Sequence, residues 1–218
     1  MSFGFGFYPT RLGRIRTNIH GYGYFCHLWF VFLEDFNRHQ ERDEIEQING
    51  VRKKWQKSAE GFVSITTDAA ILEGGGAGLG VVARDSKGDF ILAAVKRVRG
   101  IWEAEQVEAL AMELGIQTAT LIQAPRLVLE SDCQTLVLRL QNSMEDVTDM
   151  GIICGSIQRG IRNMGEVRVT HIGREANVAA HLMAQVNARW DERQVWFDTP
   201  PLMLLNQLLL DNVIDSLN

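Results

Sequence analysis

The segment that decides the fold spans residues 171–181 and reads His-Ile-Gly-Arg-Glu-Ala-Asn-Val-Ala-Ala-His. It continues a run at 167–172 that we expect to form a strand, and it leads into a segment at 175–190 that we expect to form a helix. Polar side chains that come directly after the strands of an α/β sheet gather at one rim of that sheet. The segment therefore has to be read together with three acids upstream of it, Asp68, Glu108 and Asp132.

The composition is that of a globular domain without a strong charge bias. The 218 residues are 46% hydrophobic, which is enough for a buried core and suits one domain with a tail. With 22 basic and 27 acidic side chains the net charge is −5, so no overall positive field attracts a polyanion. Any nucleic-acid contact must be local. Lys96, Arg97 and Arg99 could supply it, although such residues more often form an ordinary solvated surface.

Two classes of protein are excluded by local composition. The cysteines, at 26, 133 and 154, are odd in number and have no C-x-x-C spacing, which argues against a disulfide framework or a zinc site and favours a reducing compartment. The longest apolar stretch, at 22–33, is well short of the roughly 20 residues that a membrane-spanning helix needs. We therefore expect no transmembrane segment and no membrane partner.

The first 57 residues have no pattern that is typical of a packed domain. Arg11, Arg14 and Arg16 precede any acid, which loosely suits a transit segment. The alternative that we prefer is a poorly ordered leader rich in aromatic residues and glycine, followed by a charged helix or linker at 34–57. We expect a domain at 58–191 and a C-terminal tail at 192–218 that packs on it or follows it.

The domain itself alternates between strand and helix patterns. Period-2 runs and short apolar runs predict strands at 62–67, 78–84, 90–98, 126–130 and 167–172, and helical spacing predicts helices at 103–122, 131–140, 147–164 and 175–190. The first three strands are joined by short turns and so form an antiparallel meander. A helix between the first and fourth strands lets those two lie parallel. The prediction is an α/β fold with a five-stranded mixed sheet flanked by helices.

Three acids occupy positions where they can converge. Asp68 and Asp132 each follow directly on a strand, so parallel neighbours would bring both to the same rim. Glu108 lies on the helix between them, on the side of the small residues Ala111 and Gly115 that should face the sheet. An unpaired buried carboxylate is unfavourable, and a metal ion is one way to offset that penalty.

The residue types suit magnesium, a hard cation that binds carboxylate oxygens and keeps several waters. Two such ions could activate water and stabilise the leaving oxygen in phosphodiester hydrolysis. Taken singly, each acid could instead have a structural role: Asp132 could cap its helix beside Ser131, Asp68 could form a turn, and Glu108 could pair with an arginine. Their joint placement favours the metal site. Glu105, about one turn before Glu108, is a weaker candidate for the same site.

The glycine-rich segment 74–80 has a superficial likeness to a nucleotide-binding loop. We reject that interpretation because a strand follows the glycines instead of a helix, and because no Gly-Lys-Ser/Thr is present.

Five segments resemble successive blocks of one family, at 55–70, 78–88, 107–119, 128–137 and 171–184. They are similar to the type 1 ribonuclease H-like domain of plant retroelement-derived proteins, which lies at the end of non-LTR reverse transcriptases. The resemblance covers roughly residues 55–215. It implies the ribonuclease H-like fold, with the five strands and flanking helices described above.

The resemblance also implies a role for each residue of the site. It makes Asp68, Glu108 and Asp132 the metal-binding carboxylates, and it makes His171 the loop histidine that assists proton transfer or product release. Arg174 and Asn177 match the loop that opens the last helix, and we expect them to contact substrate.

His181 stands where the family has its fourth carboxylate. An uncharged imidazole is a poorer partner for Mg²⁺ than a carboxylate is, whereas Mn²⁺ tolerates nitrogen better. We therefore expect a two-ion Mg²⁺ site in which His181 is an impaired catalytic ligand, with slow cleavage in Mg²⁺ and Mn²⁺ able to substitute.

The resemblance implies a metal-dependent endonuclease that hydrolyses the RNA strand of RNA–DNA hybrids. The expected partner is nucleic acid, either such a hybrid or structured RNA, and the expected state is a monomer. The alternative is a retroelement-derived domain that binds nucleic acid or another partner and has lost catalysis.

Overall fold

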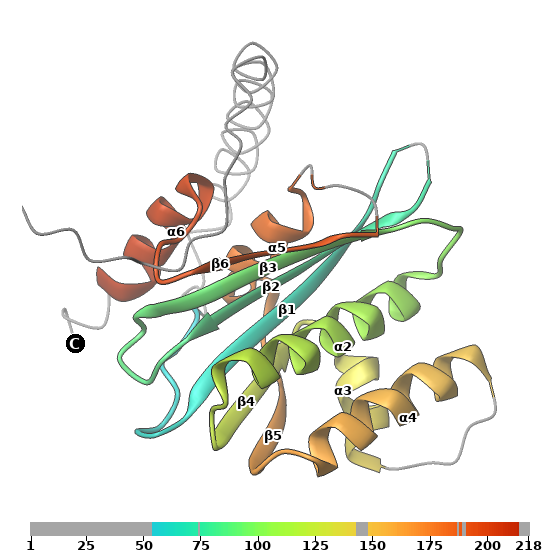
Figure 1. The fold of residues 1–218 in the computed structure, drawn as a ribbon, viewed down its shortest axis with the longest axis horizontal. Helices are drawn as coiled ribbons and strands as arrows, with labels where there is room; N and C mark the ends of the chain where they lie inside the picture. Colours follow the sequence, from blue (N-terminus) through green and yellow to red (C-terminus); the bar gives the residue numbers. More distant parts are fainter. Residues whose placement is uncertain (1–53, 74, 143–147, 187, 189–190, 214–218) are drawn as a thin grey trace, which may run out of the picture. The chain divides into compact units, whose positions relative to one another are not determined.

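A mixed sheet of six strands, in the order β5-β4-β1-β2-β3-β6, forms the centre of the described part of the chain (Figure 1). The structure is a computed structural model, and it describes residues 54–213 with the exception of 74, 143–147, 187 and 189–190. These residues belong to one unit at 53–218, and most of the expected N-terminal extension lies outside them. None of the described helices has the length and the apolar character that a membrane crossing needs.

The first three strands confirm the predicted meander. They are β1 (Val63–Ile71), β2 (Ala77–Arg84) and β3 (Phe90–Val98), each antiparallel to the next. On the other side of β1, β4 (Arg126–Ser131) pairs in parallel with β1, and β5 (Glu166–His171) pairs in parallel with β4. The predicted combination of a meander with two parallel strands is therefore correct.

The predicted number of strands is wrong, because the sheet has a sixth strand. β6 (Arg193–Phe197) pairs antiparallel with β3, with Leu92 opposite Phe197 and Lys96 opposite Arg193. It satisfies backbone groups that β3 would otherwise leave unpaired at the edge of the sheet. A signal for it is present in Val195, Trp196 and Phe197, residue types that favour strands, although the prediction places this stretch in the tail.

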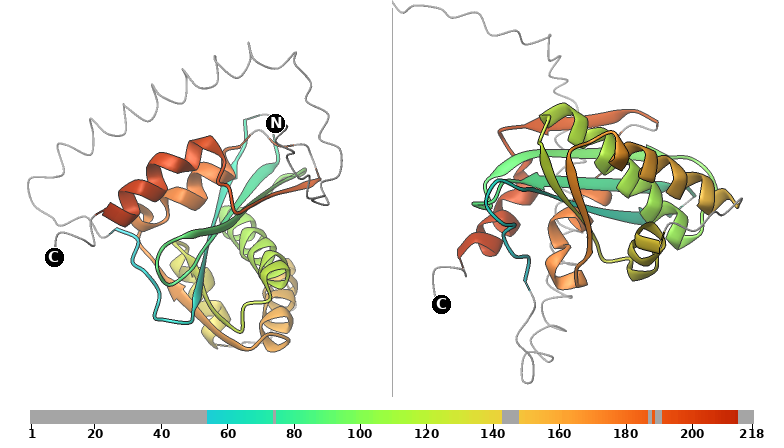
Figure 2. Two further views of the ribbon diagram at one scale, coloured as in Figure 1. Left: turned by 60° about the vertical axis from the view of Figure 1, so that its left-hand side comes forward. Right: turned by 90° about the horizontal axis from the view of Figure 1, so that it is seen from below.

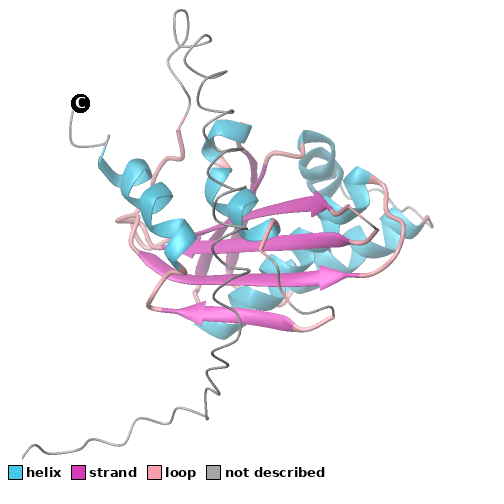
Figure 3. Ribbon diagram, turned by 90° about the horizontal axis from the view of Figure 1, so that it is seen from above, coloured by secondary structure: helices cyan, strands magenta, loops and turns pink. Residues whose placement is uncertain are grey.

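Helices cover both faces of the sheet (Figure 2; Figure 3). One face carries α2 (Ala104–Ile122), α3 (Gln134–Asn142) and α4 (Asp149–Arg162), whose apolar residues join those of the sheet in one core. The opposite face carries α5 (Val178–Ala184), and α6 (Leu202–Val213) packs beside α5. A short 3₁₀ helix, η2 (Arg174–Ala176), precedes α5.

Two predicted element boundaries need correction. β1 does not end at Asp68 but continues to Ile71, because its last residues still pair with β2 after the pairing with β4 has stopped. The helix expected at 175–190 is α5 alone, which begins after Asn177 and has its C-cap at Gln185. The separate 3₁₀ helix η2 includes the first residues of the predicted helix.

Two glycines in β2 allow α5 to lie directly on the sheet. A Cβ atom at Gly78 would come within 2.0 Å of the Ala184 carbonyl oxygen, and one at Gly80 would come within 2.3 Å of the Ala180 carbonyl oxygen. The backbone of α5 therefore rests on the backbone of β2, which only glycine permits. This contact explains part of the glycine-rich segment and fixes the helix that carries His181.

A buried polar cluster ties the start of the described chain to α6. Trp55 is 3% exposed, its Nε1 donates to Glu130 Oε2 at 2.9 Å, and its ring lies 3.7 Å from the Arg84 guanidinium. Arg84 Nη1 in turn pairs with Asp211 Oδ2 at 2.6 Å. Burial raises the pKa of Glu130 to about 7, and the hydrogen bond from Trp55 opposes that shift.

We predict that Trp55→Phe lowers the free energy of unfolding by about 1–2 kcal/mol, because it removes the Nε1–H donor while an aromatic ring stays at this position. The raised pKa of Glu130 means that the folded state retains a proton that the unfolded state releases, so stability falls as pH rises from about 4.5 to about 7. Without the bond from Trp55 the pKa of Glu130 rises further. The free energy of unfolding that the variant loses relative to the unsubstituted protein should therefore be larger at about pH 8 than at about pH 5 in urea denaturation.

Trp102→Phe is the matched control, since Trp102 Nε1 donates to the Arg99 carbonyl oxygen in an exposed hydrogen bond. It should change stability little and equally at both pH values. A deficit of Trp55→Phe that does not vary with pH would contradict this account of Glu130.

Candidate metal centre

The register of β1 and β4 brings Asp68 and Asp132 together. Thr67 and Ser131 are the last pair of the parallel ladder, and each acid follows directly on its member of that pair. Asp68 is only 4% exposed. The prediction that these two acids share one rim of the sheet is therefore confirmed in position.

Glu108 reaches the same place from α2. The helix lies close to β1, where a Cβ atom at Gly115 would come within 2.8 Å of Thr67 Cγ2. The backbone N–H of Ala69 donates a hydrogen bond to the Glu108 carboxyl group, while Oε2 of Glu108 is buried and has no hydrogen-bond partner among the described residues. An acceptor of this kind is stabilised by a ligand that takes its lone pair.

The three acids form one compact cluster. Each of Asp68, Glu108 and Asp132 offers a carboxylate oxygen, and these three oxygens lie within 4.8 Å of one another. Burial raises the pKa of Glu108 to about 9, and the charges of Asp68 and Asp132 add to the shift. Burial also raises the pKa of Asp68. Converging, poorly solvated carboxylates fit a hard divalent cation.

None of the three acids has the purely structural role that its position in the sequence allows. Asp68 lies within a strand and not in a turn. The hydroxyl of Ser131, and not the carboxylate of Asp132, accepts the backbone N–H of Cys133 at the start of α3. Arg139 pairs at 2.8 Å with Glu105, the weaker candidate one turn before Glu108. The arrangement leaves Glu108 directed at the other two acids.

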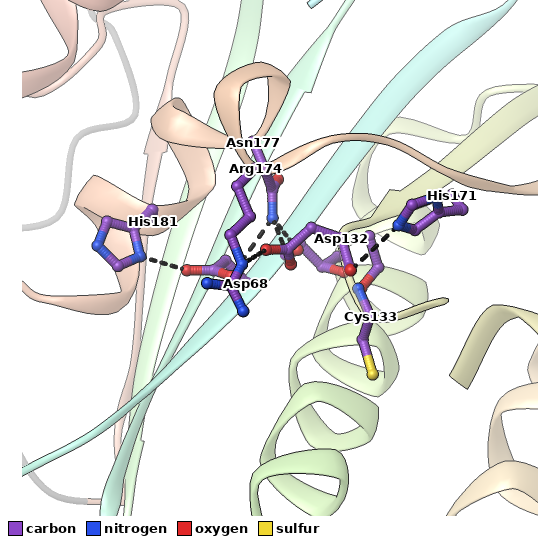
Figure 4. Close-up of polar contacts among 9 residues, drawn as sticks. Asp68, Asp132, Cys133, His171, Arg174, Asn177 and His181 are labelled. Carbon is purple, nitrogen blue, oxygen red and sulfur yellow. Dashed lines mark hydrogen bonds and ion pairs between the residues drawn. The ribbon is translucent and has the colours of Figure 1, made fainter. Parts of the chain in front are cut away.

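Asn177 holds the two aspartates in place. It is 2% exposed, and its Nδ2 group lies 3.0 Å from the Thr67 carbonyl oxygen, 3.3 Å from Asp68 Oδ1 and 3.2 Å from Asp132 Oδ1 (Figure 4). A donor shared between two like charges reduces their repulsion. The residue expected to contact substrate is thus buried behind the carboxylates.

His181 bonds one acid and lies outside the three-carboxylate cluster. Its Nδ1 is 2.8 Å from Asp68 Oδ2, and its Nε2 is 2.9 Å from Nε2 of Gln185, one turn later on the helix. The hydrogen bond to Asp68 raises the pKa of His181, and burial opposes that shift. Gln185 is not among the site residues predicted from the sequence. Its spacing of four residues from His181 on a predicted helix does indicate that the two side chains are neighbours.

His171 and Arg174 lie on the exposed side of the site. His171, at the end of β5, places Nε2 3.2 Å from the Asp132 carbonyl oxygen. Arg174 Nε is 3.7 Å from Asp132 Oδ2, and its side chain is 92% exposed. An ion pair this long and this exposed is weak, so the guanidinium is available to other anions. All seven residues expected at the site are thus close to the cluster.

We predict that Glu108→Gln stabilises the metal-free protein at about pH 8 by about 1–3 kcal/mol, since folding at that pH must keep the Glu108 carboxyl protonated, whereas glutamine is neutral at every pH. The folded pKa of about 9 lies above the ordinary value, so the stability of the unsubstituted protein falls as pH rises from about 4.5 to about 9. The gain should be small at about pH 5 in urea denaturation with chelator.

The control is Glu105→Gln, which removes an acid on the same helix that already has an arginine partner. It should change stability by less than about 1 kcal/mol at either pH. Equal gains from Glu108→Gln at both pH values would contradict the account, as would a gain from Glu105→Gln of the same size.

Comparison with known proteins agrees with this fold. The structure is similar to ribonuclease H1 from Halobacterium salinarum NRC-1, with a TM-score of 0.51, 19% identity, and coverage of 56% of this chain and 94% of that chain. It is equally similar, at a TM-score of 0.51, to the N-terminal ribonuclease H domain of rv2228c from Mycobacterium tuberculosis, solved as a fusion with maltose-binding protein. That domain is 16% identical, with coverage of 56% of this chain and 90% of that chain.

A third structure, LC11-RNase H1 isolated from compost, has a TM-score of 0.51 and 18% identity, with coverage of 56% of this chain and 92% of that chain. No curated protein matches the chain. The plant retroelement subgroup stays a prediction.

The model of the family described as "Reverse transcriptase-like" matches residues 66–187, more than half of the sequence. The chain therefore belongs to the reverse transcriptase-like family and has the ribonuclease H-like fold.

Proposed function

We propose that this protein is a divalent-metal-dependent endonuclease that hydrolyses the RNA strand of RNA–DNA hybrids. The observation that carries the proposal is the cluster of Asp68, Glu108 and Asp132, whose oxygens lie within 4.8 Å of one another. Membership of the reverse transcriptase-like family and the ribonuclease H-like fold support the same class of reaction. Fold alone does not define activity, so the proposal rests on the cluster.

Asp68, Glu108 and Asp132 would hold the metal, with Mg²⁺ as the expected ion and Mn²⁺ as a substitute. A bound divalent ion would supply charge to activate water and to stabilise the leaving oxygen in phosphodiester hydrolysis. The buried oxygen of Glu108 that has no partner supports this assignment, because coordination would satisfy it. Asn177 would keep the two aspartates oriented while the ion binds and leaves.

Two exposed residues would act on the substrate. Arg174 extends beside Asp132 and could contact a phosphate of the incoming strand. His171 has an exposed ring next to the Asp132 backbone, and it could carry a proton between the site and solvent. Discrimination of RNA would come from duplex shape and from the 2′-hydroxyl, which a wide minor groove displays.

We predict that the purified protein cleaves a labelled RNA–DNA hybrid faster in Mn²⁺ than in Mg²⁺, by a factor of the order of ten. The reason is that Mn²⁺ tolerates a nitrogen ligand such as the imidazole of His181 better than Mg²⁺ does. Asp68→Asn should abolish cleavage in both metals. Cleavage that persists in this variant would assign the activity to a contaminant. No cleavage by the unsubstituted protein in either metal would contradict the proposal.

We also predict that His181→Asp raises the rate of Mg²⁺-dependent cleavage by about tenfold, since it adds a carboxylate beside Asp68 and removes the imidazole. His181→Asn has nearly the same shape as the aspartate without its charge, and it should not raise the rate. Single-turnover kinetics on the hybrid would measure both variants. An unchanged rate in His181→Asp would show that residue 181 does not limit the reaction.

A second function is favoured by one observation, the imidazole of His181 bonded to Asp68. If that contact abolishes catalysis, the domain would still bind a hybrid or structured RNA. A gel-shift comparison of an RNA–DNA hybrid with a DNA duplex tests this alternative when no cleavage occurs. Binding of neither duplex would leave a domain that acts only through other partners.

A further inference from the structure

We infer that two copies of this chain associate through the outer edge of β5, with the two strands antiparallel and Glu166 of each copy opposite Arg168 of the other. The inference concerns an interaction surface at the edge of the sheet, and it does not depend on the proposed function. It replaces the monomer expected from the sequence with a symmetric dimer.

The outer side of β5 presents backbone groups that can pair with another strand. β5 is an edge strand, with β4 on one side and no strand of the described residues on the other (Figure 1). The N–H group of Glu166 donates to the Pro125 carbonyl oxygen, so Glu166 turns its backbone groups toward β4. Because this direction alternates along a strand, Val167 and Val169 turn theirs outward. Such a row of N–H and C=O groups is a template for pairing between molecules.

The exposed face of this edge has one acid and one base, two residues apart. Side chains two residues apart lie on the same face of a strand, and those of Glu166 and Arg168 are about half exposed. They form an ion pair with each other, in which Arg168 Nη2 lies 2.6 Å from Glu166 Oε1. Val167 and Val169 face the other way and pack against the core. A strand with this charge pattern is complementary to a second copy of itself that runs in the opposite direction.

The charges and the backbone select one register among those centred on residues 166–169. When the pair is centred on Val167, the two Val167 residues exchange backbone hydrogen bonds, and each Glu166 lies opposite an Arg168. Centring on Glu166 would place two carboxylates opposite each other, and centring on Arg168 would do the same with two guanidinium groups. Centring on Val169 would use a carbonyl oxygen that already accepts a hydrogen bond from Gln141 Nε2 at 3.0 Å.

The selected register adds ion pairs without breaking the one that exists. Glu166 and Arg168 of one copy stay neighbours along the strand, and each gains the opposite charge of the second copy across the pair. The four side chains thus alternate in sign around a square. The other edge strand of the described sheet, β6, has Arg193 as its one charged residue, so a symmetric β6 pair gains no such contact.

Sedimentation equilibrium of the full chain tests the inference. We expect the unsubstituted protein to form dimers. Arg168→Glu and Glu166→Arg should each weaken association by about tenfold or more, because each variant places like charges opposite each other twice in the symmetric pair. An equimolar mixture of the two variants should form dimers again, since every opposite pair in the mixed dimer then has unlike charges.

Arg159→Glu is the matched control, because it reverses the charge of an exposed arginine on α4 and should leave the dimer intact. The double variant Glu166→Arg/Arg168→Glu exchanges the two charges and should also be a dimer, which distinguishes lost pairing from lost folding. An unsubstituted protein that is monomeric at every concentration measured would overturn the inference. Single variants that associate as tightly as the unsubstituted protein would also overturn it, as would a monomeric double variant that urea denaturation shows to be folded.

Discussion

The parallel pairing of β1 with β4 is the constraint on which the site depends. Its last pair, Thr67 and Ser131, sets both aspartates at the same height along the sheet. A slip of one residue would turn one of them to the other face, because side chains alternate along a strand. The helix between the two strands then has to cross the sheet, and in crossing it delivers Glu108 to the same point. Topology therefore assembles three like charges that no local sequence brings together.

The rest of the unit holds that unfavourable assembly in place. Buried groups elsewhere in the unit form their own paired network, in which Trp55 contacts both Glu130 and Arg84. Glu130 comes two residues before Asp132, and its backbone carbonyl accepts the hydroxyl of Thr67, next to Asp68. Glu130 thus both binds Trp55 and links β4 to β1 directly before the two aspartates.

Much of this arrangement could be predicted from the sequence, because local patterns encode it. Alternating apolar residues indicated the meander, and the positions of Asp68 and Asp132 after strand patterns indicated a shared rim. The features that were not predicted correctly depend on contacts with residues far away in the sequence. β6 forms because β3 has a free edge, and β1 runs past Asp68 because β2 continues beside it. The inward position of Asn177 likewise depends on the carboxylates of Asp68 in β1 and of Asp132 directly after β4, which spacing along the chain does not reveal.

The part of the chain matched by the family ends at residue 187, whereas β6 and α6 follow it. A recombinant fragment cut at that boundary would lose Asp211 and leave Arg84 as an interior cation without its counterion. It would also uncover the hydrogen-bonding edge of β3, a template for pairing between molecules. Expression trials limited to the matched region should therefore yield protein that self-associates, visible by light scattering, and the last two elements belong in any preparation meant for enzymology.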